Sequence, residues 1–247
     1  MAEESERRES REPRVIAKPP VHVGRRTVLG ILGLTGIGIA AGAKIDSALG
    51  SSITAVSSAI GVPLPGADNF RYYTITGSYP VIAADTYELA VDGMVKTPLR
   101  LSIADLRSMQ RAKLVHRFQC VTGWYVPGVH WEGVLVSELL NLAGVTSKAT
   151  ALRFYSADGA YTESLTLAQA HLHDVIVADL MQSANLTSEH GGPVRLYVAP
   201  MYGYKSCKWL DTIELTNSVQ AGYWEGRGYD VDGWVGHSNH RSDDTTS

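Results

Sequence analysis

Two groups of residues in this 247-residue chain have side chains suited to catalysis or ligand binding. The first contains a cysteine within Phe118-Gln-Cys120-Val-Thr-Gly-Trp. The pattern of residues 115–120 predicts a strand, which places the thiol at the strand end, before a glycine-containing loop that runs to residues 131–133. A thiol there can reach a bound group. Three roles stay open for Cys120: a buried core cysteine, a nucleophile and a ligand for a soft metal.

The second group lies in two neighbouring segments, His190-Gly-Gly-Pro-Val-Arg195 and Tyr202-Gly-Tyr-Lys205-Ser-Cys-Lys208-Trp. Glycine lets a ligand approach backbone N–H groups closely, and arginine and lysine donate charge-assisted hydrogen bonds to phosphate. Convergence of Arg195, Lys205 and Lys208 therefore predicts an anion site. A solvated basic turn is the alternative.

The surrounding pattern predicts a mixed α+β domain that is richer in strands than in helices. Alternation and turn residues indicate an antiparallel pair of strands, and Ser102, three positions before Asp105, is typical of a helix start. Gly144 marks a helix end. The expected strands are 87–93, 99–101, 115–120, 151–156, 175–178, 194–199 and 212–215, and the expected helices begin after Ser102 and cover 136–143 and about 167–172.

The composition describes one globular domain with a tail, since 45% of the residues are hydrophobic and 19% are charged. A net charge of -3 gives no general electrostatic reason to expect nucleic acid as a partner. We expect Cys120 and Cys207 to be separate thiols, because secreted disulfide scaffolds normally contain more cysteines.

The N-terminal region has the pattern of an exported protein. Residues 1–24 mix acidic and basic side chains without an apolar face, so we expect disorder there. Arg25-Arg26 precedes an uncharged, Gly/Ala-rich stretch, so residues 25–43 are interpreted as a twin-arginine signal or membrane anchor. Residues 44–68 are predicted to be a linker, residues 69–235 the folded domain, and residues 236–247 a C-terminal tail.

The order of these motifs resembles the molybdopterin-binding domain of the sulfite oxidase superfamily. The resemblance depends on Cys120-Val-Thr-Gly-Trp with Trp131-Glu-Gly, on the His190 to Arg195 run, and on Lys205-Ser-Cys-Lys-Trp209. It covers residues 69–224, approximately. The resemblance implies a strand-rich sulfite oxidase-type fold with molybdenum and molybdopterin as cofactors, and it favours the metal-ligand role for Cys120.

Specific site residues also follow from the resemblance. Cys120 would be the protein ligand to molybdenum, and Tyr161 a catalytic tyrosine on the substrate side. Cys207 would contribute through its backbone rather than as a second ligand. The positions that would bind the pterin or its phosphate are Asn69, Tyr72, Tyr73, Cys120, Ser156, His190, Arg195, Ser206, Cys207 and Lys208. For Arg195 the alternative is an exposed strand charge, and for Tyr72 and Tyr73 it is a place in the core.

This chain departs from the family pattern directly after the cysteine. Sulfite oxidases usually continue with Cys-x-Gly-Asn-Arg-Arg, whereas this chain has Val-Thr-Gly-Trp-Tyr after Cys120. The arginines expected to hold sulfite are therefore missing. Arg117 would replace them only if a bulge turned it to the face that Cys120 occupies. Reduction of an S-oxide or N-oxide is thus favoured over sulfite oxidation.

The implied protein is an exported oxidoreductase on the periplasmic or extracytoplasmic side of the membrane. Its expected partners are a small-molecule substrate and a redox protein, for which a membrane haem protein is one candidate. Without the family's dimerisation domain, a monomer or a weak hetero-complex is expected. Two alternatives remain: a metal-free hydrolase using Cys120 with His190 or His116, and an exported binding module without catalysis.

Overall fold

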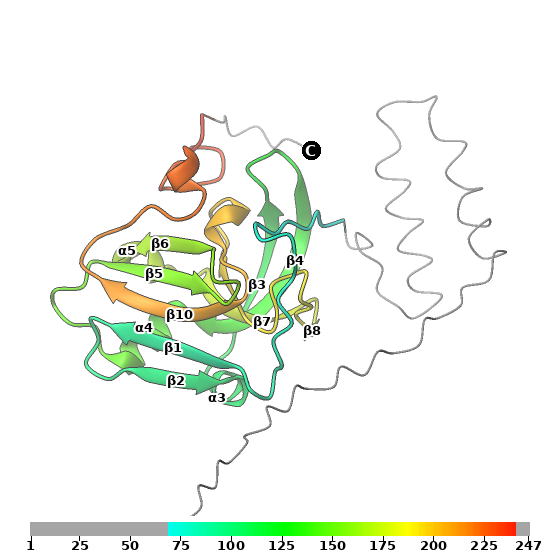
Figure 1. The fold of residues 1–247 in the computed structure, drawn as a ribbon. Helices are drawn as coiled ribbons and strands as arrows, with labels where there is room; N and C mark the ends of the chain where they lie inside the picture. Colours follow the sequence, from blue (N-terminus) through cyan, green and yellow to red (C-terminus); the bar gives the residue numbers. More distant parts are fainter. Residues whose placement is uncertain (1–68, 241–247) are drawn as a thin grey trace, which may run out of the picture.

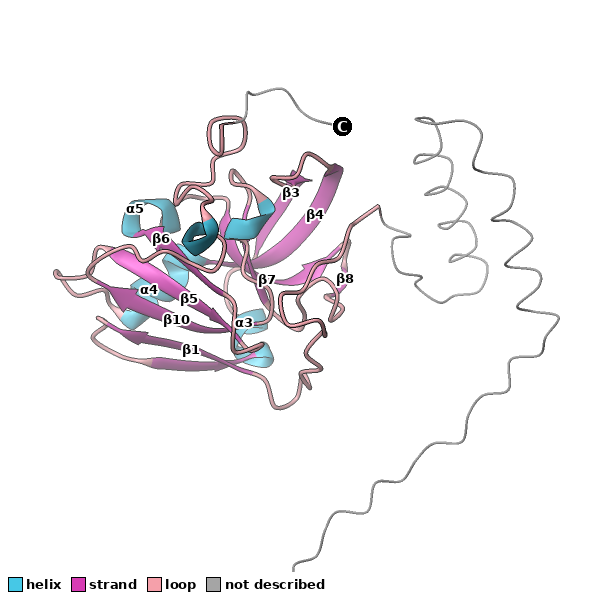
Figure 2. Ribbon diagram, turned by 45° about the horizontal axis from the view of Figure 1, so that its top comes forward, coloured by secondary structure: helices cyan, strands magenta, loops and turns pink. Residues whose placement is uncertain are grey.

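The computed structural model describes residues 69–240, which form two β-sheets with short helices between and beside them (Figures 1 and 2). The predicted disordered segment, twin-arginine signal and linker lie outside the described residues, as do residues 241–247. Within residues 69–240, no helix is both long enough and apolar enough to cross a membrane. The mixed, strand-rich α+β class is confirmed.

The first sheet has the strand order β2-β1-β10-β5-β6. Strands β1 and β10 run parallel, and the other neighbours run antiparallel, including the predicted pair β1 and β2. Buried and more exposed side chains alternate along β1, and its apolar residues Leu89 and Val91 are both fully buried. The strands are β1 (Glu88–Gly93), β2 (Leu99–Ser102), β5 (Ala151–Ser156), β6 (Thr162–Thr166) and β10 (Leu210–Thr216).

The second sheet has the order β3-β4-β7-β8, and β9 pairs with β7 as a branch. Figure 1 shows it beside the first sheet, with its longest strands rising away from β10. Strand β3 ends one residue before Cys120, as the sequence pattern predicts. The strands are β3 (Ala112–Gln119), β4 (Tyr125–Leu135), β7 (Val175–Met181), β8 (Ala184–Asn185) and β9 (Arg195–Val198).

Short helices connect the strands and fill the space between the sheets. Helix α3 (Ile103–Ser108) begins with a capping box in which Ser102 and Asp105 bind each other's backbone N–H groups. Helix α4 (Val136–Ala143) contributes four buried residues to the main core, together with strands of both sheets. The remaining helical turns are α5 (Leu167–Ala170), η1 (Gly203–Lys205) and η2 (Glu225–Arg227).

The loop expected between Gly123 and Gly133 is wrong, because most of it forms strand β4. Pro127 and Gly128 are atypical of a strand interior, so the sequence pattern does not predict β4. The strand nevertheless pairs with both β3 and β7. Gly133 is required at the β7 contact, since an added Cβ would lie only 2.1 Å from the carbonyl oxygen of Val177. Strands β6 and β8 were also not predicted, and α5 is shorter than expected.

Residues 236–240, which the sequence assigns to the C-terminal tail, make contacts with the rest of the domain. Ser238 is buried, and the side chain of Asn239 donates to the hydroxyl of Tyr204 at 3.1 Å. The backbone N–H of Gly236 donates to the hydroxyl of Tyr202 at 3.0 Å. Residues 236–240 therefore pack on the domain.

Candidate active site

Cys120 faces a cavity of about 470 Å³ that draws its walls from distant parts of the chain. The lining residues come from segments 70–75, 118–124, 158–161, 189–195, 203–209 and 223–229. Eight sequence-predicted site residues are brought together there: Tyr72, Tyr73, Cys120, Tyr161, His190, Arg195, Ser206 and Lys208.

The turn after β3 presents the Cys120 thiol to the cavity. The backbone N–H of Cys120 donates to the carbonyl oxygen of Trp124 at 2.9 Å, and Gly123, at a φ of 110°, closes the turn by donating back to Cys120. The sulfur is half-buried and lies 3.2 Å from the hydroxyl oxygen of Thr122. Both cysteines are free, as expected. This exposure leaves the thiol able to bind a group in the cavity.

Arg195 is a buried cation at the cavity wall, so the alternative of an exposed strand charge is wrong. Its side chain donates to the carbonyl oxygens of His190 at 2.7 Å and Ser206 at 3.0 Å. The residue is only 4% exposed, and this burial lowers the pKa of the guanidinium to about 10. A buried charge satisfied by neutral carbonyls favours the approach of an anion.

Lys208 provides a second cation in the same cavity. Its ammonium group donates to the carbonyl oxygens of Tyr73 at 2.5 Å and Glu189 at 3.1 Å. Burial, followed by repulsion from Arg195, lowers the pKa of Lys208 to about 7. An anionic ligand between Lys208 and Arg195 would offset both the cost of burying the ammonium group and its repulsion from the guanidinium.

The third predicted cation does not join them. The ammonium group of Lys205 is 1% exposed and donates to the carboxylates of Glu163 and Glu225 and to the carbonyl oxygen of Ser164. This ion cluster satisfies Lys205 internally. The predicted convergence of three cations on one phosphate is therefore wrong for Lys205.

The first residues of the domain form one wall of the cavity around a buried histidine. The Nε2 atom of His190 lies 3.3 Å from the hydroxyl oxygen of Tyr72, and the ring of Phe70 packs edge-on against the imidazole. Tyr73 is 54% exposed, so the alternative of a core position is wrong for this residue. It stacks on Trp124 at the cavity surface.

Tyr161 is distant in the sequence from residues 70–75, yet it lines the same cavity. Its hydroxyl donates to the carbonyl oxygen of Tyr204, and its ring stacks on Tyr223 at 5.9 Å between centroids. Burial, with the nearby Glu163 carboxyl as a second cause, raises the pKa of Tyr161 well above its usual range. The phenol therefore stays protonated and acts as a donor.

Three predicted residues have side chains that do not line the cavity. Asn69 is exposed, the Ser156 hydroxyl is buried and accepts from the backbone of Asp158 at 3.2 Å, and the Cys207 thiol lies in the main core. Ser206 lines the cavity, but its hydroxyl accepts from Val198 N–H at 3.0 Å.

Arg117 cannot replace the missing arginines. The strand does bulge between His116 and Phe118, but the Arg117 side chain is exposed and lies over the ring of Tyr125 at 5.1 Å. It is not a lining residue of the cavity. Neither is His116, which removes the pairing with Cys120 proposed for a hydrolase.

Sequence reasoning missed the aromatic residues that complete the cavity: Phe70, Phe118, Trp124, Tyr204, Tyr223, Trp224 and Tyr229. The excess of tyrosine and tryptophan over phenylalanine was the one available signal, because such rings suit a pocket with polar tips. A composition, however, does not indicate which of these tyrosines and tryptophans line a pocket.

Comparison with known proteins identifies the domain. The family model described as "oxidoreductase molybdopterin binding domain" matches residues 76–224. The chain belongs to this family. The resemblance to the sulfite oxidase superfamily is thereby confirmed, and oxidoreductase replaces the hydrolase and binding-module alternatives.

Individual relatives agree with this assignment. An uncharacterized oxidoreductase, YuiH of Bacillus subtilis, is 32% identical over 64% of this chain and 80% of its own length. The putative protein-methionine-sulfoxide reductase subunit YedZ1 of Azospira oryzae is 32% identical over 64% of this chain, which spans 58% of that protein. In the crystal structure of the sulfane dehydrogenase SoxCD from Paracoccus pantotrophus, 41% of one chain matches 57% of this one, with a TM-score of 0.53 and 23% identity, which supports the fold.

The residues of the cavity fit the group that this family binds. A half-buried thiol suits a soft metal, and the buried Arg195 together with the partly buried Lys208 suits a phosphate. In addition, the buried indole N–H of Trp124, at the cavity wall, has no acceptor within the described part of the chain. A bound polar group would satisfy that donor.

Proposed function

We propose that this protein is an exported molybdenum-cofactor oxidoreductase that reduces an S-oxide or N-oxide rather than oxidising sulfite. The observation that carries the proposal is the surroundings of Cys120. Where the family's sulfite oxidases have two arginines, this chain has Trp124 and Tyr125, and Arg117 is exposed and does not line the cavity. A small anion such as sulfite would therefore find rings instead of cations beside the thiol.

The site residues divide into three proposed roles. Cys120 would ligate molybdenum, because thiolate is a soft donor. Arg195 and Lys208 would bind the phosphate, with the Ser206 segment beside them, while Tyr72, Tyr73 and His190 would contact the pterin. For Asn69, Ser156 and Cys207, only backbone or indirect contributions are proposed, because their side chains do not line the cavity.

The molybdenum cofactor, when bound, supplies two-electron oxygen-atom transfer. The protein's own contribution is to bind, orient and donate protons. The phenol of Tyr161 is protonated and donates its single hydrogen to the carbonyl oxygen of Tyr204. We propose that it turns from this carbonyl to donate to the substrate oxygen. Reduction of an S-oxide consumes two protons and two electrons and releases water, so a donor at that position suits the reductive direction.

Export and electron supply complete the proposal. Arg25-Arg26 supports the twin-arginine route to the periplasm or the extracytoplasmic face of the membrane, with the signal cleaved or retained as an anchor. The name of the Azospira oryzae relative describes a subunit, which suits a hetero-complex. We therefore propose that a membrane haem protein supplies the electrons.

The direct test combines metal analysis with two assays on protein purified from a host that makes the cofactor. We expect about one molybdenum per chain, since Cys120 is the single proposed protein ligand. Reduced viologen should be oxidised with methionine sulfoxide or trimethylamine N-oxide, whereas ferricyanide should not be reduced with sulfite. Protein that holds molybdenum but turns over sulfite alone would contradict the proposed direction.

A further inference from the structure

One part of the cavity wall is built from uncharged rings that contact each other. Tyr161 stacks on Tyr223, Tyr223 meets Trp224 edge-on at 5.2 Å, and Trp224 meets Tyr229 at 5.4 Å between centroids. Tyr229 in turn packs against Tyr204 at 5.5 Å. We call these five residues the C-terminal aromatic wall. Val121, the residue after Cys120, packs in the same apolar cluster, so the wall adjoins the thiol.

One ring of the wall lies beyond the region that the family model matches. The family model matches residues up to Trp224, whereas Tyr229 lies beyond that match. The cations of the cavity, Arg195 and Lys208, lie inside the matched region. The other four rings of the wall lie inside it as well. Within the cavity, the uncharged rings rather than the two cations are the candidate for selecting an uncharged substrate.

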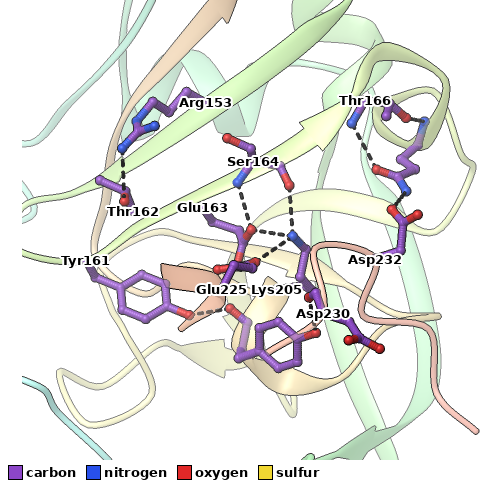
Figure 3. Close-up of polar contacts among 12 residues, drawn as sticks. Arg153, Tyr161, Thr162, Glu163, Ser164, Thr166, Lys205, Glu225, Asp230 and Asp232 are labelled. Carbon is purple, nitrogen blue, oxygen red and sulfur yellow. Dashed lines mark hydrogen bonds and ion pairs between the residues drawn. The ribbon is translucent and has the colours of Figure 1, made fainter. Parts of the chain in front are cut away.

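The Lys205 ion cluster connects the chain segments that carry the rings of the wall (Figure 3). Lys205 Nζ donates to Glu225 at 2.9 Å and to the carboxylate of Glu163, with both glutamate side chains at most 1% exposed. Lys205 directly follows Tyr204, Glu225 directly follows Trp224, and Glu163 lies two residues after Tyr161 on the chain. Each charged residue therefore anchors one segment of the wall.

A second set of contacts holds the segment after Trp224 in place. The hydroxyl of Tyr204 donates to the carbonyl oxygen of Asp230 at 2.6 Å and accepts from the side chain of Asn239 at 3.1 Å. The backbone N–H of Tyr223 donates to Thr162 at 3.0 Å. The rings are consequently preorganised, and little ordering is required when a ligand packs on them.

We propose that the C-terminal aromatic wall binds the organic substituent of an uncharged S-oxide and thereby selects substrates, with Glu225 as its positioning residue. This inference rests on the proposed S-oxide reduction. Ring faces attract apolar groups and sulfur, and their negative potential disfavours an anion. Burying a carboxylate among rings also costs its hydration without a compensating partner.

The test uses two ligands of nearly the same shape. Binding of methyl p-tolyl sulfone and of 4-(methylsulfonyl)benzoate, neither of which is turned over, is measured by calorimetry on the oxidised holoenzyme. We expect the neutral sulfone to bind at least about tenfold more tightly. Equal affinities, or tighter binding of the benzoate, would overturn the inference.

Ring-removal variants then locate the selectivity. Trp224→Ala and Tyr229→Ala should each weaken binding of the neutral sulfone by about tenfold, because a ring that contacts the ligand is lost. Tyr155→Ala, which removes a ring from the first sheet outside the cavity, is the matched control and should leave both affinities unchanged. Folded Trp224→Ala and Tyr229→Ala proteins with wild-type affinities would overturn the inference.

The positioning role of Glu225 is tested by a split between kinetic constants. Glu225→Leu should raise KM for methyl p-tolyl sulfoxide by about tenfold and raise KM for dimethyl sulfoxide, which has no ring to pack on the wall, by much less. Glu225→Gln should restore part of the loss through its hydrogen bond. If Glu225→Leu does not fold, Glu225→Gln alone decides, since an unchanged KM in that variant contradicts the role.

The two proposals fail in different ways. A wild-type enzyme that reduces no S-oxide, yet binds the neutral sulfone through Trp224 and Tyr229, would refute the proposed reaction and leave the selectivity of the wall standing. If the wild-type enzyme reduces S-oxides and the Trp224→Ala and Tyr229→Ala variants do so with the same KM, the proposed role of the wall alone is refuted.

Discussion

Lys208 donates a hydrogen bond to the carbonyl oxygen of Tyr73, a residue 135 positions away. This contact ties the start of the described domain to the segment after β9 at the point where two cations line the cavity. The ammonium group therefore has two potential tasks, one towards the backbone and one towards an anion. Substitution can separate them.

Lys208→Met should release the cofactor more readily than the wild type, because a charge-assisted bond is worth about 1.5 to 3 kcal/mol, or about tenfold and more in affinity. Molybdenum content after dialysis measures the loss. Lys148→Met at an exposed position is the control and should retain its metal. Lys205→Met is unsuitable as a control, since it would leave Glu163 and Glu225 buried together without their cation.

Anion binding to cofactor-free protein should weaken as the pH rises. The pKa of Lys208 is lowered to about 7 by burial, so its charge is present below that pH and is lost above it. Sulfate keeps a constant charge over the range from about pH 6 to about pH 8.5 and is a suitable probe. Its affinity should fall across this range in the wild type. A Lys208→Met protein with the same pH dependence would assign the effect to another group.

Cys120→Ser should abolish turnover while most of the pterin stays bound. The proposed pterin contacts are spread over Tyr72, His190, Arg195 and Lys208, whereas Cys120 would touch the metal alone. A serine oxygen is a harder donor than a thiolate and should change the electron density of the metal. Turnover per bound molybdenum is the measurement. A variant with wild-type turnover per metal would exclude Cys120 as the ligand.

Asp179→Ala should destabilise the domain by about 1 to 3 kcal/mol, because the buried carboxylate accepts charge-assisted hydrogen bonds from two partly exposed arginines. Asp179 is 1% exposed and accepts from Arg107 at 2.7 Å and from Arg111, which join α3 to β7. Urea unfolding measures the change. Asp85→Ala, at an exposed position, should change the free energy of unfolding by less than about 0.5 kcal/mol. Similar unfolding midpoints for the two variants would contradict the prediction.

Replacing Arg25 and Arg26 together by lysine should leave folded, metal-loaded protein in the cytoplasm. In the proposed twin-arginine signal, the arginine pair would be the part that the export machinery reads, and it precedes the catalytic domain. Cell fractionation with molybdenum analysis of each fraction is the measurement. Unchanged export would exclude the twin-arginine route.

The elements predicted correctly are those whose signal lies within a few residues. The alternation around Leu89 and Val91 and the capping pair Ser102 and Asp105 are local, and both are found in the structure. Strand β6 was missed because both of its faces bury a polar residue, Glu163 on one and Ser164 on the other, and the charge of Glu163 is compensated by Lys205, a residue 42 positions away. Local patterns contain no information about such a partner.

The candidate site shows the same division. Motif residues such as Cys120, Arg195 and Lys208 were found because their types and order resemble a family. Tyr223 and Tyr229 were missed, because their positions depend on ring contacts between loops. Lys205 was misjudged for a related reason: its charge resembles that of Lys208 in the sequence, and only the fold reveals the two carboxylates around it.

Because the cavity combines segments 70–75, 118–124 and 189–195 with residues up to 229, a ribosome must release nearly the whole domain before the binding site exists. A nascent chain that ends before Arg195 would present the thiol of Cys120 without Arg195 and Lys208, the two cations that line the cavity. Insertion of the proposed cofactor would consequently follow translation of the domain, and chains that terminate early would compete poorly for it.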